Sequence, residues 1–283
     1  MFEQITDAVA YHAEGPVWTK EWGGLRWVDM LEGDLLTLKD NGEIDRLHVG
    51  SPIAAFVRPR ASGGFVVGLE RGIGLSGEPF GEVHALEPIW TDPDIRMNEG
   101  GTDPWGNLYA GSMSYSRKEG AGKLYKISPN HDVTTVLESV STSNGIDFSP
   151  DGTKAYYHDT GTRRTDVFDV VDEEITNRRE FHEASGTSPD GLTVDSEGNV
   201  WVALNRVGKV RLYSPEAEIL GEWDLPARLV TAVTLGGEDG RDVFVTTSRE
   251  DLDDPTSAEG AIFHGREPDD GEERVSSAVA TNV

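Results

Sequence analysis

Short apolar runs that follow glycine-containing turns recur along the whole chain. Each run alternates apolar with polar or small residues, a pattern typical of β-strands with one face buried. The runs are Gly23–Met30, Gly63–Glu70, Gly106–Met113, Gly152–Asp159, Gly198–Asn205 and Gly240–Thr247. Glycine supplies the positive φ that a tight hairpin turn requires. Since no convincing amphipathic helix accompanies these runs, the pattern predicts an all-β protein.

The spacing of the runs predicts a repeat architecture. Between Gly24, Gly64, Gly106, Gly152, Gly198 and Gly240 the steps are 40, 42, 46, 46 and 42 residues. Most runs are followed by a second strand–turn–strand segment, and the weakest of these segments is Glu82–Trp90. About four strands in a unit of this length make one propeller blade. We therefore predict a single six-bladed β-propeller domain over residues 1–283, with a large sandwich or another all-β sheet as the less regular alternative.

Ring closure gives expectations for both ends of the chain. In propellers the last blade often combines strands from both termini, so we expect residues near the N-terminus to complete it. The tail beyond Arg266 is acidic and then small and polar. We expect it to contribute an edge strand at most, with frayed last residues.

Four polar positions have comparable surroundings ahead of the glycine-headed strands. Asn98, Asn144 and Asp190 each precede the glycine of their repeat by eight residues, and Glu14 lies in a similar segment, AEGPVW. We expect them, together with Arg96, in loops that open onto one central funnel. Carboxylate and amide oxygens suit Ca²⁺, Mg²⁺ or Mn²⁺ and can also hold Zn²⁺. Asn-Gly and Asp-Gly are also common turn formers, so these residues alone leave a metal site and ordinary turns equally open.

Eight segments carry a family resemblance across nearly the whole chain. They are Glu14–Trp18, Trp27–Asp29, Arg96–Gly100, Asp103–Asn107, Ala110–Met113, Ser143–Ser149, Pro189–Leu192 and Gly260–Phe263. In this order they resemble the gluconolactonase/regucalcin (senescence marker protein) family. The resemblance implies a six-bladed propeller that hydrolyses sugar-acid lactones, such as glucono-, xylono- or arabino-lactone, to the open-chain acids.

The resemblance also implies a role for each matching position. Glu14, Asn144 and Asp190 match the ligands of one divalent metal ion, and Asp190 matches the general base as well. Arg96 and Asn98 match the pair that holds oxygen atoms of the substrate. The expected small-molecule partner is therefore a sugar lactone, and the expected cofactor is one Ca²⁺, Mg²⁺, Mn²⁺ or Zn²⁺ ion.

Two departures from the family pattern concern the pocket. Glu99 stands where the family more often has aspartate, and we expect it at the pocket rim. The loop after Met113 does not clearly reproduce the family's lid, which leaves Glu119 as the candidate for a substrate-contacting acid. His158 could line the funnel, although a structural histidine is the better expectation.

Composition narrows the class of partner and compartment. Acidic residues outnumber basic ones by 51 to 25, and the net charge of −26 argues against nucleic acid or an anionic membrane as a partner. Without cysteine, disulfides and thiolate metal sites are excluded. The N-terminal sequence resembles no signal peptide and no apolar run is long enough to span a membrane, so we expect a cytoplasmic protein with no obligate protein partner. The lysine-poor, acid-rich composition predicts a halophilic source.

Two other functions remain open at this stage. The first is a non-catalytic propeller that binds a ligand or a protein, because a fold does not determine a function. The second is a hydrolase of the same fold that acts on other esters, such as phosphotriesters. A complete Glu14, Asn144 and Asp190 set argues against the first alternative, since a scaffold needs no metal ligands.

Overall fold

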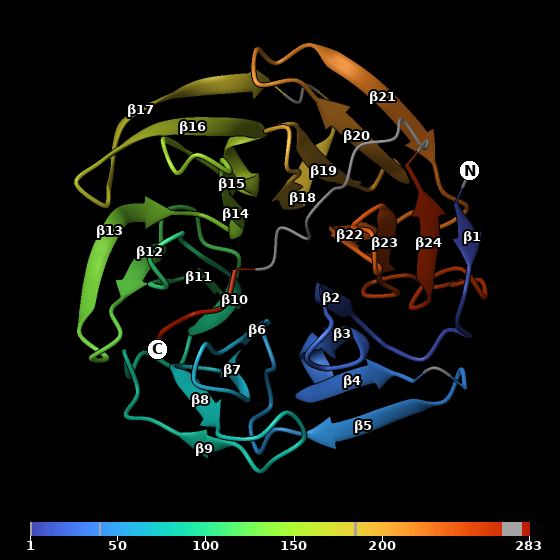
Figure 1. Ribbon diagram of the computed structural model, residues 1–283, viewed down its shortest axis with the longest axis horizontal. Coiled ribbons are helices and arrows are strands. Elements are labelled where there is room, and N and C mark those ends of the chain that lie inside the picture. Colours follow the sequence, from blue (N-terminus) through green and yellow to red (C-terminus); the bar gives the residue numbers. More distant parts are fainter. Residues whose placement is uncertain (1, 40, 184–185, 268–278) are drawn as a thin grey trace.

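Six four-stranded antiparallel sheets form a closed ring in the computed structural model, which describes residues 2–39, 41–183, 186–267 and 279–283 (Figure 1). The six-bladed β-propeller expected from the glycine repeat is therefore confirmed. Within these ranges the helical elements are two single-turn 3-10 helices, η1 (Met30–Glu32) and η2 (Thr160–Thr162). None of the described helices is long and apolar enough to cross a membrane.

The first three blades follow one another along the chain, each built as two consecutive hairpins. Blade one contains β2 (Ala13–Thr19), β3 (Gly24–Asp29), β4 (Asp34–Leu38) and β5 (Ile44–His48). Blade two contains β6 (Val57–Pro59), β7 (Phe65–Gly68), β8 (Ile73–Ser76) and β9 (His84–Ala85). Blade three contains β10 (Ile95–Thr102), β11 (Leu108–Ser114), β12 (Gly122–Ile127) and β13 (Val133–Val140). The segment with the weakest sequence pattern provides β9, which has only two residues.

Blades four and five repeat the same order, and blade six closes the ring. Blade four contains β14 (Ser143–Phe148), β15 (Lys154–Asp159), β16 (Arg164–Val171) and β17 (Glu174–Glu183). Blade five contains β18 (Ser188–Val194), β19 (Val200–Asn205), β20 (Lys209–Tyr213) and β21 (Ile219–Asp224). Blade six contains β22 (Val230–Gly236), β23 (Asp242–Thr247), β24 (Ile262–Arg266) and β1 (Glu3–Gln4).

The N-terminal strand completes the last blade, as expected. Glu3 pairs with His264 in an antiparallel register, so β1 forms the outer edge beside β24. Most of the acidic tail, residues 268–278, lies outside the described residues. Beyond it, Thr281 forms a parallel bridge with Arg60, and Val283 is buried among apolar side chains of the first blades. Contacts between distant parts of the chain therefore hold the ring closed.

The glycine turns have the backbone conformation that the repeat predicts. In blade three, Gly106 has φ +86°, and the Asp103 carboxylate accepts hydrogen bonds from the backbone N–H groups of Trp105 and Asn107. Blade five repeats this turn, with Asp195 as acceptor and Gly198 at φ +88°. A left-handed position is disfavoured for residues with a Cβ atom, which explains the recurring glycine.

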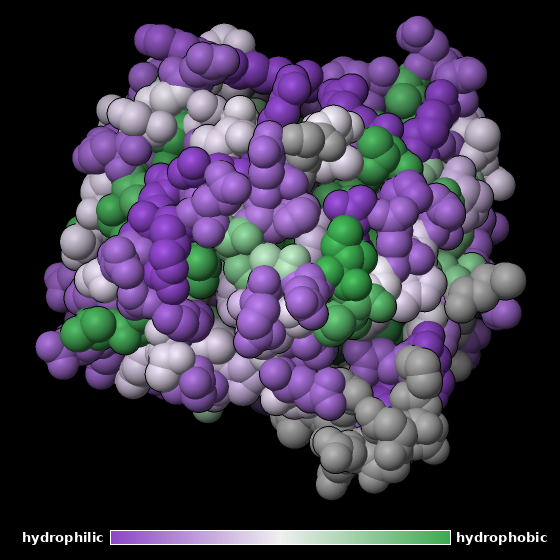
Figure 2. Space-filling model, turned by 90° about the horizontal axis from the view of Figure 1, so that it is seen from above, coloured by the Kyte–Doolittle hydropathy of each residue, from purple (hydrophilic) through white to green (hydrophobic). Residues whose placement is uncertain are grey.

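Apolar side chains pack between neighbouring blades, and polar residues cover the outside. The Trp201 and Trp223 rings of blade five stack with centroids 5.1 Å apart, in a cluster that also contains Val243 and Val245 of blade six. Trp27 is fully buried. On the face drawn in Figure 2, hydrophilic residues predominate and apolar side chains form small, separate groups. The innermost strands, such as β10, β14 and β18, lie side by side around the ring axis and position the site described next.

Candidate active site

A cavity of about 280 Å³ opens at one end of the ring. Its walls include side chains from the innermost strands of blades one, three, four and five. Glu14, Arg96, Asn98, Asn144 and Asp190, which the sequence analysis selected, all line it. Residues almost 180 positions apart in the chain thus share one chamber of a size suited to a small molecule.

Four of these residues, Glu14, Asn98, Asn144 and Asp190, lie at β-bulges of the innermost strands, and Arg96 lies on β10 just before the bulge. The expectation that they lie in loops before those strands was wrong. The register shifts between Glu14 and Val17 in β2 and between Ser143 and Ile146 in β14. Equivalent shifts occur around Asn98 in β10 and Asp190 in β18. A bulge frees one residue from the ladder and re-aims its side chain. Repetition of the bulge in adjacent blades turns polar side chains toward one cavity.

The glycines that directly follow Asn144 and Asp190 are explained by close strand approach. A Cβ atom at Gly145 would lie 2.5 Å from the backbone nitrogen of Leu192, and one at Gly191 would lie 2.4 Å from the Ala232 Cβ. The Asn-Gly and Asp-Gly pairs are therefore parts of bulged strands, and the interpretation of these pairs as ordinary turns does not apply here.

Two buried carboxylates face the cavity without a cationic partner. Glu14 is 2% exposed and Asp190 is 6% exposed. Burial raises the pKa of Asp190 to about 7, and burial together with the charge of Asp190 raises the pKa of Glu14 well above its usual value. Within the described chain, no lysine or arginine forms an ion pair with either carboxylate. The nearby His12 ring does not compensate, because burial lowers the pKa of His12 to about 3.

A chain of hydrogen bonds fixes the remaining polar groups. The Arg96 Nη1 donates to the Asn98 Oδ1 at 2.7 Å, and the Asn98 Nδ2 donates to the Asn144 Oδ1 at 3.3 Å. The Asn144 Nδ2 donates to the Thr160 Oγ1 at 2.8 Å, and that hydroxyl donates to the backbone oxygen of Pro189. The chain links blades three, four and five, so each amide has one defined orientation.

The donor set fits a divalent cation of the hard, oxygen-binding type. Glu14 and Asp190 offer carboxylate oxygens, and the Asn144 side chain offers an amide oxygen. The charge of Asp190 raises the pKa of Glu14 in this desolvated site, and a bound divalent cation would offset the repulsion between the two carboxylates. In the described ranges, no group of three His, Cys, Asp or Glu side chains is arranged to hold a metal, and this set contains only two such side chains beside the Asn144 amide.

Other predicted positions lie elsewhere. Glu119 is exposed on the β11–β12 loop and does not line the cavity, although Tyr115 and Arg117 of the same loop do. His158 is fully buried and structural, as expected: its Nδ1 lies 2.6 Å from the backbone oxygen of Asp190 and its Nε2 lies 2.8 Å from the Thr165 Oγ1. It therefore supports the backbone at Asp190.

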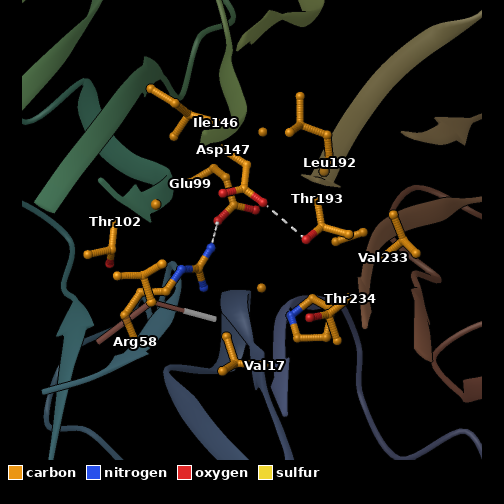
Figure 3. Close-up of a pocket in the computed structure, with 17 residues that line it drawn as sticks. Val17, Arg58, Glu99, Thr102, Ile146, Asp147, Leu192, Thr193, Val233 and Thr234 are labelled. Atoms are coloured by element: carbon orange, nitrogen blue, oxygen red, sulfur yellow. Dashed lines mark hydrogen bonds and ion pairs between the residues drawn. The ribbon is translucent and has the colours of Figure 1, made fainter. Parts of the chain in front are cut away.

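Glu99 lies in a narrow channel behind the site, and the expectation that it lies at the rim was wrong. Neighbouring residues of the bulge point in opposite directions, so Asn98 faces the cavity and Glu99 faces this channel of about 50 Å³. There the Arg58 Nη2 pairs with the Glu99 Oε1 at 3.2 Å (Figure 3). Asp147 lies beside this pair and accepts a hydrogen bond from the Thr193 hydroxyl. The channel thus has its own charged network.

Several cavity residues escaped the sequence analysis. His12 precedes Glu14 by two positions, and alternation along a strand places both side chains on one face. This alternation could have identified His12 from the sequence. Asn205 ends the strand that pairs with β18, and its Nδ2 donates to the Asp190 Oδ2 at 2.6 Å. Arg117 and Glu250 meet across the ring, and no local pattern in the sequence indicates that contact.

Comparison with known proteins adds the following findings. The family model described as SMP-30/Gluconolactonase/LRE-like region matches residues 12–249. The chain is 35% identical to the 6-deoxy-6-sulfogluconolactonase of Pseudomonas putida, over 84% of this chain and 83% of the relative. It is 30% identical to the pentonolactonase XacC of Haloferax volcanii, over 88% and 86% of the two chains. The crystal structure of the calcium-binding protein regucalcin from Agrobacterium tumefaciens superposes with a TM-score of 0.85 at 25% identity, covering 96% of this chain and 93% of that one.

Proposed function

The chain belongs to the SMP-30/gluconolactonase/LRE-like family, and from this premise we propose that it hydrolyses sugar-acid lactones with one divalent cation held by Glu14, Asn144 and Asp190. The relatives named above act on gluconolactone-type and pentonolactone-type rings, which supports a lactonase. The observation that carries the proposal is the convergence of two buried, cation-free carboxylates and one amide on repeated bulges of a single cavity.

Each side chain of the site has its own role in the proposed reaction. Asp190 accepts a proton from the water whose oxygen bonds to the lactone carbonyl carbon. The ring C–O bond then breaks, and Asp190 returns that proton to the departing alkoxide. Arg96 and Asn98 orient the hydroxyl and carbonyl oxygens of the substrate. When bound, a divalent cation supplies Lewis-acid polarisation of the lactone carbonyl.

Two neighbouring groups suit Asp190 to this role by holding it in place. The Asn205 amide and the His158 ring fix its side chain and backbone, respectively. Asp190 therefore stays oriented toward the cavity.

The proposal extends to a cytoplasmic location and a halophilic source. A salt-rich cytoplasm suits a chain with a net charge of −26, because salt screens the repulsion among its carboxylates. A haloarchaeal relative of similar length supports this assignment.

The direct test is hydrolysis of a panel of neutral lactones (glucono-, galactono-, xylono- and arabino-lactone) in molar KCl. We expect acceleration over the spontaneous rate, and Asp190→Asn to lower kcat by about 100- to 10,000-fold, the usual contribution of a general base. Asp172→Asn is the matched control, because Asp172 lies in an exposed outer turn with φ +51° that asparagine readily adopts. No acceleration by folded protein, or turnover only of other esters such as phosphotriesters, would replace this proposal with one of the two alternatives.

A further inference from the structure

The cavity is locally much less acidic than the chain. Its charged lining consists of three carboxylates and three guanidinium groups: Glu14, Asp190, Glu250, Arg96, Arg117 and Arg206. Their formal charges cancel, whereas the whole chain carries a net charge of −26. A surface that is acidic elsewhere thus concentrates arginine where a small molecule would bind.

Two of the three arginines lack a carboxylate partner among the described residues. Arg117 pairs with Asp251 at 2.8 Å and with Glu250 at 3.6 Å. Arg96 is 7% exposed and its hydrogen bonds go to neutral acceptors. Arg206 is exposed and forms no ion pair within the described part of the chain. The cavity therefore holds two guanidinium groups with no direct carboxylate contact, one buried and one exposed.

Arg206 lines the cavity next to a residue that contacts the proposed base. It follows Asn205 in the turn between β19 and β20, with φ +67°. The Asn205 amide donates to the Asp190 carboxylate at 2.6 Å, so the residue before Arg206 is tied to the proposed base. A guanidinium on this turn can reach a substrate whose carbonyl lies near Asp190.

Cation binding would leave the cavity with a positive excess. A divalent cation held by Glu14 and Asp190 would offset their two charges, and Arg117 is shared between Glu250 and Asp251. Arg96 and Arg206 then remain unpaired. From this balance, and resting on the lactonase activity proposed above, we propose that the cavity selects lactones that carry an anionic substituent and that Arg206 binds this substituent. Sulfonate and phosphate share the chemistry that a guanidinium recognises, namely several acceptor oxygens in a fork-like arrangement.

The experiment compares neutral and anionic forms of one ring. Hydrolysis rates are measured for gluconolactone, 6-phosphogluconolactone and 6-deoxy-6-sulfogluconolactone, at the lowest KCl concentration that keeps the protein folded. We expect kcat/KM about 10- to 100-fold higher for at least one anionic lactone, the range for a charge-assisted contact. Arg206→Gln should collapse this ratio. The preference should also shrink as KCl is raised, because exposed charges are screened.

Arg163→Gln provides a matched control. Arg163 occupies the corresponding turn of blade four with φ +55°, is exposed, and does not line the cavity. We expect Arg163→Gln to leave the ratio of anionic to neutral kcat/KM unchanged. The arms also separate the two anion types, since a preference for the phosphate alone or the sulfonate alone identifies the substituent.

The outcomes distinguish this inference from the proposed function. Hydrolysis of gluconolactone without any preference for an anionic form would overturn the inference and leave the lactonase proposal intact. An equal fall of the ratio in Arg206→Gln and Arg163→Gln would also overturn the inference and leave the lactonase proposal intact. No hydrolysis of any lactone by folded protein would overturn the proposed function and, with it, this inference.

Discussion

Arg117 of blade three and Asp251 of blade six form an ion pair at 2.8 Å, although 134 residues separate them in the chain. Blades three and six face each other across a six-membered ring (Figure 1). Since Arg117 also lines the cavity, the β11–β12 loop reaches over the cavity mouth and is held there from the opposite side.

Breaking this pair should affect substrate binding more than folding. An exposed ion pair contributes about 1 kcal/mol or less to stability, so Asp251→Asn should barely change the free energy of unfolding. The loop that carries Tyr115 and Arg117 loses an anchor, and we expect KM to rise by up to about fivefold, the equivalent of that energy. Denaturant unfolding and steady-state kinetics measure the two effects. The control is Asp253→Asn, which removes one charge from the β23–β24 loop that also carries Asp251. Asp253 forms no ion pair among the described residues, so this variant should leave KM unchanged. An equal rise of KM in both variants would show that the charge of the loop matters and not the ion pair.

Arg96 should matter mainly for binding. Its guanidinium is buried, and it holds the Asn98 amide in place. We expect Arg96→Ala to raise KM by about 10- to 100-fold, the loss of hydrogen bonds that involve a charged group, with a smaller fall in kcat. Arg96→Lys keeps the charge but loses the fork geometry and should recover only part of the affinity. A large fall in kcat at constant KM would place Arg96 in the chemical step instead.

The half-buried Asp147 predicts a pH dependence of stability. Burial raises its pKa in the folded protein to about 6, from a usual value of 3.8. The protonated form is therefore favoured by folding, and its stabilising contribution is complete below about pH 4 and lost as pH rises through about 6. We expect Asp147→Asn to gain stability relative to the unmodified protein between pH 4 and pH 7, by at most about 3 kcal/mol. Urea unfolding at several pH values measures this difference, and a constant difference across the range would contradict it.

The acidic composition predicts stabilisation by salt. With 51 acidic and 25 basic residues, repulsion within the folded chain is strong in dilute buffer and is screened at high ionic strength. We expect Tm to rise by several degrees between dilute buffer and molar KCl. Sorbitol at matched osmolality is the control for effects that do not depend on charge. A Tm that is indifferent to KCl would contradict the halophilic assignment.

The sequence predicted the ring and most of the candidate site because both depend on local repetition. Each blade has a glycine turn, and in blades three, four and five the bulged inner strand carries a polar residue eight positions before that glycine. Asn98, Asn144 and Asp190 were therefore found by register alone. The bulges themselves were not predicted, because an extra residue in a strand leaves no separate mark on the apolar pattern.

What the sequence did not reveal depends on contacts between distant blades. Glu99 was expected at the rim, but the bulge turns it away from Asn98 toward Arg58 in the channel. Arg117 meets Asp251 only because the ring closes. Both contacts join residues that lie far apart in the chain, so a repeated pattern along the sequence does not reveal them.

The most direct test of the account is metal-restored lactone hydrolysis. Protein stripped with EDTA would be dialysed into molar KCl and titrated with Ca²⁺, Mg²⁺, Mn²⁺ or Zn²⁺, while bound metal and the initial rate of gluconolactone or xylonolactone hydrolysis are measured together. The account predicts that activity is lost on stripping and returns in proportion to one bound ion per chain, with weaker ion binding in Glu14→Gln. Full activity in metal-free protein, or ion binding that Glu14→Gln leaves unchanged, would contradict it.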